Sequence, residues 1–172
     1  MLLLTIGLPG SGKSALLKRL GLPRPDMAVV TPDRIRWEFF GVTFDPAVEP
    51  EVWTVVRAAV RGNLRRGRSV ALDATNLTRA WRSGWLRLAR RYGHPVVGVH
   101  FDLSLKQVRK QNRMRVPEWV VPEAVIAEMA RMLEPPTEAE GFHAVVTIRG
   151  GLDDGAVRRV QEAMVRVDGR RR

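Results

Sequence analysis

An apolar run at residues 2–6 leads directly into the octapeptide Gly-Leu-Pro-Gly-Ser-Gly-Lys-Ser at residues 7–14. The octapeptide fits the pattern G-x-x-x-x-G-K-[ST], in which a Gly-rich turn joins a buried strand to a helix. Such a turn wraps a phosphate so closely that side chains at its tightest points would collide with the ligand. The sequence therefore predicts a phosphate-binding loop between a first strand and a helix at residues 13–20.

The positions of this loop have predicted roles. Lys13 is expected to reach the β- and γ-phosphates of a nucleoside triphosphate, and the Ser14 hydroxyl is expected to bind Mg²⁺. The backbone of the loop and the positive end of the helix are expected to supply the other nucleotide contacts. These contacts are assigned to Gly7, Pro9, Gly10, Ser11, Gly12 and Ala15. ATP, or another nucleoside triphosphate, with Mg²⁺ is the predicted cofactor.

Strand-like apolar runs alternate with helical patterns along the rest of the chain. Strands are expected at 2–6, 27–31, 69–75, 95–102 and 144–148. Helices are expected at 13–20, 32–40, 49–67, 78–93, 104–115, 122–133 and 153–167, with a loop at 134–141. Five strand–helix alternations predict an α/β fold with a central parallel sheet of about five strands and helices on both faces. The length of 172 residues fits one domain, with a basic tail at 168–172.

Composition narrows the class of protein. The chain has no cysteine and no run of the roughly 18 apolar residues that a membrane span needs, and its N-terminus lacks the features of an export signal. We therefore expect a cytoplasmic protein without a membrane partner. The net charge of +11, with arginine far outnumbering lysine, indicates an anionic partner such as nucleic acid. A GC-rich genome would also favour arginine over lysine, so charge alone does not decide.

The segment Thr-Pro-Asp-Arg-Ile-Arg follows the second predicted strand. Ligands collect at the carboxyl ends of strands in open parallel sheets, and Asp33 and Arg36 share one face of the helix that starts there. Asp33 could accept the proton of an incoming hydroxyl, and Arg36 could hold an acceptor phosphate. The alternative is that Asp33 only stabilises the helix N-terminus while Arg36 is solvated.

With these motifs, and with the segments Leu-Asp-Ala-Thr-Asn-Leu and Arg-Lys-Gln-Asn-Arg-Met-Arg, residues 1–150 resemble the 5′-hydroxyl polynucleotide kinases of phage and bacterial nucleic-acid repair. The resemblance implies a kinase-type P-loop NTPase fold with a helical lid at about 104–133. It implies that Asp33 is the general base for the acceptor 5′-OH and that Arg36 contacts the acceptor phosphate. Nucleic-acid 5′-OH ends would then be the substrate, and repair partners such as a ligase or phosphatase would be separate proteins.

The third predicted strand ends in a further group of polar residues. Asp73 is placed to reach Mg²⁺, and Thr75 and Asn76 are expected to line the acceptor cleft. The similar kinases have an acidic residue one place later, where this chain has Ala74, so the acceptor contact of that residue is missing here. The alternative is that Asp73 and Asn76 only form a turn at the strand end.

The segment 108–115 carries four basic residues and is the lid in the resemblance. Arg115 matches the second of two family arginines, and Asn112 is assigned with it to the nucleotide. The first family arginine falls on Gln111, and Arg109 or Arg113 could replace it. A mobile cation over the γ-phosphate would stabilise charge in the transition state. The alternative is a solvated basic helix face.

Other aromatic and titratable residues receive simpler interpretations. Trp81 and Trp85 lie at helical spacing with Leu88 and are expected in the core, whereas Trp37 could border the acceptor groove. Trp53 and Trp119 are left unassigned. None of the three histidines has metal-ligand spacing; they are His94, His100 and His143.

Two other function classes stay open at the level of sequence. A small P-loop kinase could phosphorylate a metabolite, a sugar nucleotide or aminoacyl-tRNA with the same residues. A nucleotide-dependent binding module would need the phosphate loop but no base, which speaks against it because Asp33 and Arg36 are present. DNA against RNA, the preferred nucleotide donor and the oligomeric state are not decided by the sequence.

Overall fold

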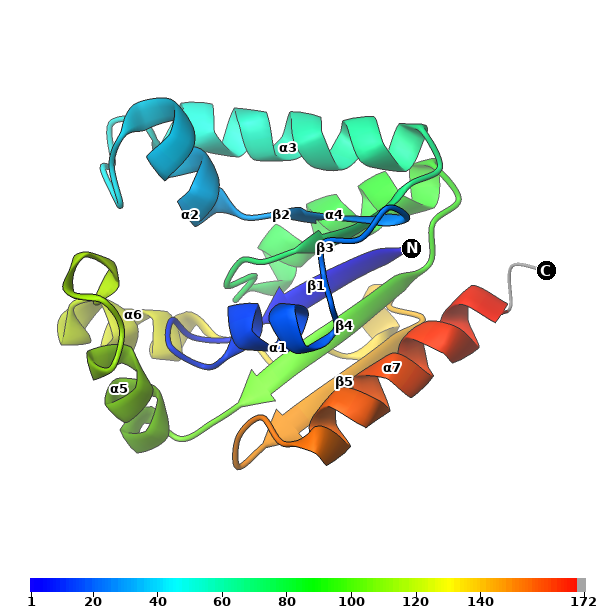
Figure 1. Cartoon of the computed structure of the whole chain (residues 1–172). Coiled ribbons are helices and arrows are strands. Elements are labelled where there is room, and N and C mark those ends of the chain that lie inside the picture. Colours follow the sequence, from blue (N-terminus) through cyan, green and yellow to red (C-terminus); the bar gives the residue numbers. More distant parts are fainter. Residues whose placement is uncertain (170–172) are drawn as a thin grey trace.

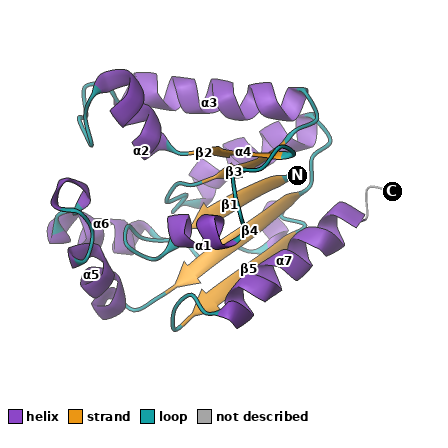
Figure 2. Ribbon diagram, viewed as in Figure 1, coloured by secondary structure: helices purple, strands orange, loops and turns teal. Residues whose placement is uncertain are grey.

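The computed structural model describes residues 1–169, which form a five-stranded parallel sheet with helices on both faces (Figures 1 and 2). The strand order is β2–β3–β1–β4–β5. The strands are β1 (Leu2–Ile6), β2 (Met27–Val30), β3 (Ser69–Leu72), β4 (Val96–Asp102) and β5 (Ala144–Arg149). In the register of the sheet, Leu2 of the central strand pairs with both Val70 and Val96. The predicted fold class, a P-loop NTPase of the kinase type, is confirmed.

The predicted helices are present in the described residues, with shifted ends. They are α1 (Lys13–Arg19), α2 (Pro32–Ile35), α3 (Glu49–Arg65), α4 (Arg79–Arg91), α5 (Leu105–Arg113), α6 (Glu123–Met132) and α7 (Asp154–Gly169). The range 32–40, predicted as one helix, divides into two parts. The α-helix α2 ends at Ile35, and a π-helical turn (Arg36–Phe40) follows it directly. Short 3₁₀ turns occupy Pro117–Trp119 and Glu138–Glu140, the latter inside the segment predicted as a loop.

The C-terminal prediction is partly corrected. Asp168 and Gly169 are the last residues of α7 rather than the start of a tail. The remainder of the basic tail predicted at 168–172 lies outside the described residues. No helix in the part of the chain that the structure describes is long and apolar enough to cross a membrane.

Two hydrophobic layers enclose the sheet because successive side chains of a buried strand point to opposite faces. Leu3 of β1 packs in the layer formed with α1 and α7, whereas Leu2 and Leu4 pack in the layer formed with α3 and α4. A third, smaller cluster joins Leu8 and Leu77 to α5 and α6 at the carboxyl ends of the strands. In Figure 1, α2, α5 and α6 accordingly lie beyond the arrowheads of the sheet.

A buried ion pair ties the start of α4 to the segment before β5. The Arg82 guanidinium donates to both carboxylate oxygens of Glu140 at 2.8 Å and to the carbonyls of Asn76, Leu77 and Glu134. Its side chain is 0% exposed and that of Glu140 is 2% exposed. Although burial opposes the shift, hydrogen bonds from Arg82 and Thr137 hold the pKa of Glu140 below its ordinary value. This pair therefore fixes the chain around Asn76, next to the candidate site.

We predict that Arg82→Met lowers the free energy of unfolding by about 3–5 kcal/mol, because it leaves a buried carboxylate unpaired. The control Arg34→Met breaks the exposed Arg34–Glu38 pair and should cost at most about 1 kcal/mol. Because the pKa of Glu140 is depressed, the pair stabilises the fold above the ordinary carboxyl pKa and loses that effect as pH falls through the folded value. Urea unfolding at neutral and acid pH measures both effects, and equal losses for the two variants would contradict the prediction.

Candidate active site

The phosphate loop is shaped by glycines at positions that other residues could not occupy. Gly10 and Gly12 have φ of +80° and +99°, in the left-handed region that favours glycine. A Cβ at Gly10 would lie 3.0 Å from the Val108 carbonyl oxygen of α5. Glycine is therefore needed at position 10 both for the turn of the loop and for the close approach of α5. We call residues 105–132, which contain α5 and α6, the α5–α6 segment.

The loop ends where α1 begins. The first hydrogen bond of the helix runs from the Leu16 N–H to the Gly12 carbonyl at 2.9 Å. The N–H groups of Lys13, Ser14 and Ala15 consequently have no partner within the helix and carry its positive end. Such an arrangement is suited to an anion, as the sequence predicted.

Lys13 is buried beneath the loop, with 8% of the residue exposed. Its Nζ donates to the carbonyls of Leu8 at 2.7 Å and Gly7 at 3.0 Å. Burial lowers the pKa of the Lys13 ammonium to about 8, although the carboxylates of Asp73 and Asp33 oppose the shift. Burial thus disfavours the charged form of this lysine, and an anionic ligand bound beside it would stabilise that form.

Ser14 and Asp73 meet beside this lysine. Burial raises the pKa of the Asp73 carboxyl above its ordinary value, although the nearby Ser14 hydroxyl and Lys13 oppose the rise. A hydroxyl and a carboxylate at a phosphate loop are oxygen ligands of the kind Mg²⁺ prefers. Within residues 1–169 no group of three His, Cys, Asp or Glu could hold a metal. A magnesium ion at Ser14 and Asp73 would therefore take its other ligands from the nucleotide and from water.

Asp33 lies in the first turn of α2 and is joined to Arg36 as its spacing predicted. Arg36 Nη1 donates to Asp33 Oδ1 at 2.5 Å. The side chain of Asp33 is 51% exposed, whereas that of Arg36 is 10% exposed. Asp33 acts electrostatically on both Lys13 and Asp73. The carboxylate thus faces solvent close to the phosphate loop, while the arginine is embedded behind it.

Sequence reasoning missed the second partner of Arg36. Glu49, at the start of α3, accepts from Arg36 Nε at 2.5 Å and from Nη2 at 3.0 Å. Although burial opposes the shift, Glu49 and Asp33 hold the pKa of Arg36 above its ordinary value. Glu49 also accepts a 3.1 Å bond from Trp53 Nε1. No local spacing connects Glu49 to Arg36, since the contact depends on how α3 folds back over α2.

The residues predicted to line the acceptor cleft lie at the end of β3. The Thr75 carbonyl accepts from the Gly7 N–H at 3.0 Å. Asn76 is buried, has a φ of +45° and donates from Nδ2 to the Thr5 carbonyl at 2.8 Å. Ala74 packs in the hydrophobic layer beneath α3 and α4. Thr75 and Asn76 are therefore anchored to the phosphate loop and the strand before it, and acceptor contacts by them stay predictions.

The residues assigned to the lid have mixed environments. Arg115 follows α5 and acts electrostatically on Lys13 and Asp73, so it lies near the phosphate loop. Both polar groups of the Asn112 side chain bind the Val121 backbone, at 2.8 Å and 3.1 Å. A nucleotide contact by Asn112 stays a prediction and would require it to exchange one of these bonds.

Both candidates for the missing lid arginine lie next to an acidic residue of α6. Arg113 donates to Glu123 at 2.6 Å, and Arg109 Nε lies 3.8 Å from the other oxygen of Glu123. That Nε atom is buried without a hydrogen-bond partner in the described residues. The two arginines therefore share one carboxylate of α6 and join the two helices of the α5–α6 segment.

The tryptophans divide between core and surface. Trp85 is buried, as predicted, but Trp81 is 49% exposed, so the prediction that it belongs to the core is wrong. Its ring lines a surface groove between α3 and α4 instead. Trp37, on the π-helical turn, packs against Trp119 with ring centroids 6.2 Å apart. This contact joins the α2 side of the site to the α5–α6 segment.

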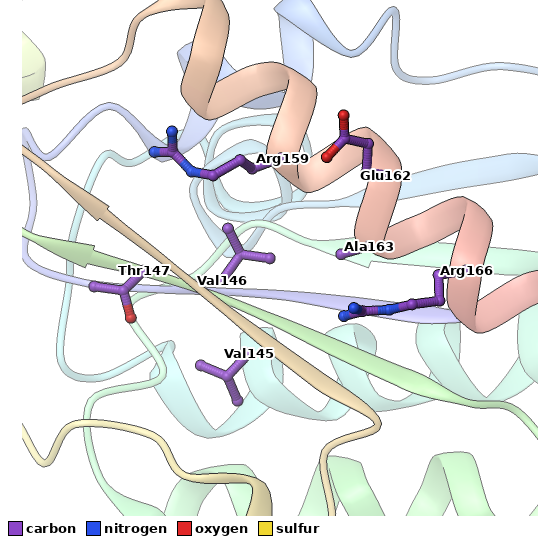
Figure 3. Close-up of a pocket in the computed structure, with 7 residues that line it drawn as sticks. All are labelled: Val145, Val146, Thr147, Arg159, Glu162, Ala163 and Arg166. Atoms are coloured by element: carbon purple, nitrogen blue, oxygen red, sulfur yellow. The ribbon is translucent and has the colours of Figure 1, made fainter.

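A cavity of about 530 Å³ lies elsewhere, between β5 and α7 (Figure 3). Arg159, Glu162 and Arg166 border it from α7, and Val145 and Thr147 border it from β5. β5 is an edge strand, separated from β1 and the phosphate loop by β4. This cavity therefore takes no part in the site built around Lys13.

Comparison with known proteins agrees with this geometry. A family model described as an AAA domain matches residues 2–136, and the chain belongs to that family. The fold and the phosphate loop define a P-loop nucleotide-binding protein of the kinase type.

Three solved structures illustrate the range of similar proteins. Kti12 from Chaetomium thermophilum, in complex with ADP-AlF3, is 17% identical with a TM-score of 0.75, over 97% of this chain and 98% of that one. A Pnkp1/Rnl/Hen1 RNA repair complex contains a chain that is 25% identical with a TM-score of 0.65, over 77% of this chain and 43% of that one. A gluconokinase from Sinorhizobium meliloti 1021 is 20% identical with a TM-score of 0.61, over 97% and 93%. The first and third show the fold alone.

We predict that binding of MgATP takes up a proton at pH 8.5, because the triphosphate raises the depressed pKa of Lys13. The affinity should fall as pH rises above about 8, by up to about tenfold per pH unit. Calorimetric titration in two buffers of different ionisation enthalpy measures the uptake. Lys18→Met, which removes an exposed lysine of the same helix, should retain it, and binding without proton uptake in the unmodified protein would contradict the prediction.

Proposed function

We propose that the protein is an ATP-dependent kinase that transfers the γ-phosphate of ATP to the 5′-OH end of DNA or RNA. The observation that carries the proposal is the position of Asp33. Its half-exposed carboxylate is held by Arg36 and lies within electrostatic reach of Lys13 and Asp73. A protein that only binds nucleotide has no need of a fixed, solvent-facing carboxylate at this place.

The residues divide the work of the transfer. Lys13 and the loop N–H groups hold the β- and γ-phosphates, and Arg115 adds positive charge from the α5–α6 segment. Ser14 and Asp73 would hold Mg²⁺, which neutralises charge on the phosphates when bound. The oxygen of the acceptor hydroxyl forms a bond to the γ-phosphorus while the bond between that phosphorus and the bridging oxygen of ADP breaks. Asp33 accepts the proton that the hydroxyl loses. Positioning and charge neutralisation supply most of the rate enhancement.

Arg36 takes a double role in this proposal. Three of its five N–H groups are engaged by Asp33 and Glu49. It therefore positions Asp33, and a phosphate of the acceptor would have to use the two N–H groups that remain. Since the guanidinium is largely buried, such a contact would come only from a group inserted deeply into the cleft.

The choice of acceptor rests on charge and on one comparison. The net charge of +11 favours a polyanion over a neutral sugar. The similar chain at 25% identity belongs to a structure described as an RNA repair complex. A second candidate keeps the chemistry but has a small hydroxylated metabolite as acceptor. The phosphate loop and Asp33 would serve that acceptor equally well, since a proton acceptor beside the γ-phosphate suits any hydroxyl group.

The direct test incubates the protein with Mg²⁺, γ-labelled ATP and 5′-OH oligonucleotides of DNA and RNA. Label should appear at the 5′ end, and Asp33→Asn should reduce the rate by at least about 10²-fold because it removes the proton acceptor. Asp26→Asn, an exposed carboxylate paired with Arg24, serves as the control and should act normally. Labelling of gluconate or another small hydroxyl compound, with none of the oligonucleotides, would overturn the choice of acceptor.

We predict that Glu49→Gln lowers kcat about tenfold while KM for ATP stays unchanged, because Asp33 loses part of its support but the phosphate loop does not. Steady-state kinetics at varied ATP separates the two parameters. The conservative Glu49→Asp should restore part of the rate, since it retains the charge. An equal change in KM for ATP, or a loss of rate explained by unfolding in a thermal melt, would contradict a positioning role.

A further inference from the structure

A groove of about 670 Å³ lies between α3 and α4. We call it the α3–α4 groove. Its principal lining residues are Trp53, Arg57 and Arg61 of α3, Asn76 after β3, and Trp81 and Trp85 of α4. The three α3 residues are four positions apart and therefore form one stripe along the helix. No role has been assigned above to the two arginines of this stripe.

The chemistry of the groove is aromatic and cationic. Arg57 and Arg61 are exposed, and neither has an ion-pair partner within residues 1–169. No carboxylate lines the groove. Trp81, 49% exposed, presents an indole ring to the same space. An exposed aromatic ring beside unpaired arginines is the combination that proteins use to stack a base of single-stranded nucleic acid and to bind its phosphates.

One end of the groove reaches the candidate active site. Trp53 donates from Nε1 to Glu49 Oε2 at 3.1 Å, and Glu49 holds the Arg36 that holds Asp33. Asn76 directly follows Thr75, whose carbonyl binds the phosphate loop. The groove and the catalytic carboxylate are therefore joined by a short chain of hydrogen bonds.

The other end of the groove leads away from the site. α3 begins at Glu49 and rises about 1.5 Å per residue, so Arg57 and Arg61 lie about 12 Å and 18 Å farther along the helix. In Figure 1, α3 runs from the side of α2 across the molecule, away from the α5–α6 segment. A chain whose end lies at Asp33 could thus continue along α3 with its charges passing both arginines.

We propose that the α3–α4 groove binds the single-stranded body of the polynucleotide acceptor, with a base stacked on Trp81 and phosphates paired with Arg57 and Arg61. The proposal rests on the proposed function, because it names the part of the substrate beyond the reacting 5′ end. A small metabolite would occupy only the cleft at Asp33 and would have no use for two arginines one and two turns beyond Trp53.

The test uses a double variant, Arg57→Gln with Arg61→Gln, and a single variant, Trp81→Leu. The matched control is Arg90→Gln with Arg91→Gln, two exposed arginines of α4 that do not line the groove. Fluorescence anisotropy measures binding of a labelled 5′-OH DNA 12-mer, and kinetics compares the 12-mer with a dinucleotide. All altered residues except Trp81 are exposed arginines, and a thermal melt verifies the folding of each variant.

We expect Trp81→Leu to raise Kd and KM for the 12-mer about 5–100-fold, the range that one stacked base supports. The arginine double variant should reduce the magnitude of the log Kd against log salt slope by about 1.4, since each lost phosphate contact contributes about 0.7 on a single strand. The dinucleotide, which is too short to pass both Arg57 and Arg61, should keep its KM in the arginine double variant. The control should behave as the unmodified protein.

The binding and transfer measurements distinguish failure of this inference from failure of the proposed function. Unchanged 12-mer affinity and salt slope in both groove variants would overturn the groove, even if the 5′ end is phosphorylated. Equal losses for the 12-mer and the dinucleotide in the arginine double variant would overturn it too, because Arg57 and Arg61 would then act at the site itself. Absence of transfer to any oligonucleotide, with groove-dependent binding intact, would overturn the kinase assignment and leave the groove as a nucleic-acid binding surface.

Discussion

Burial of the Lys13 ammonium is the constraint on which the rest of the site depends. Removing a cation from water is unfavourable unless other groups compensate for the lost hydration. Here two loop carbonyls accept its protons, and the carboxylates of Asp73 and Asp33 offset part of the cost. The three residues come from α1, the end of β3 and the start of α2, so the sheet order that places β3 beside β1 is what brings them together.

The same region shows how charge is arranged outward from the lysine. Asp73 is buried against Ser14, whereas Asp33 faces solvent and depends on Arg36 for its position. Arg36 in turn depends on Glu49, and Glu49 is bound by Trp53 of α3. The acidic groups near the phosphate loop are thereby graded from the buried Asp73 to the half-exposed Asp33, which the proposed function makes a metal ligand and a proton acceptor. That gradation fits group transfer better than it fits simple nucleotide storage.

Much of this organisation could be predicted from local patterns. The strands are continuous apolar runs, the phosphate loop has a fixed spacing, and Asp33 and Arg36 are neighbours on one helix turn, so each follows from a short window of sequence. Glu49 could not be found in this way, because its contact with Arg36 spans 13 residues and a change of helix direction. Trp81 was misplaced because helical spacing identifies one face of α4 but does not show that this face borders an open groove rather than the core. The groove between α3 and α4 likewise arises from the packing of two helices and has no sequence signature of its own.

The most direct test of the account is a crystal structure with ADP, Mg²⁺, aluminium fluoride and a 5′-OH oligonucleotide. The account predicts that the aluminium fluoride, in the place of the transferred phosphoryl group, lies between the β-phosphate and the 5′ oxygen. An Asp33 carboxylate oxygen should lie about 2.6–3.2 Å from that 5′ oxygen. Lys13 should then contact the phosphates rather than the loop carbonyls alone. An Asp33 side chain turned away from the 5′ oxygen, with another residue or only water as the proton acceptor, would contradict the central claim.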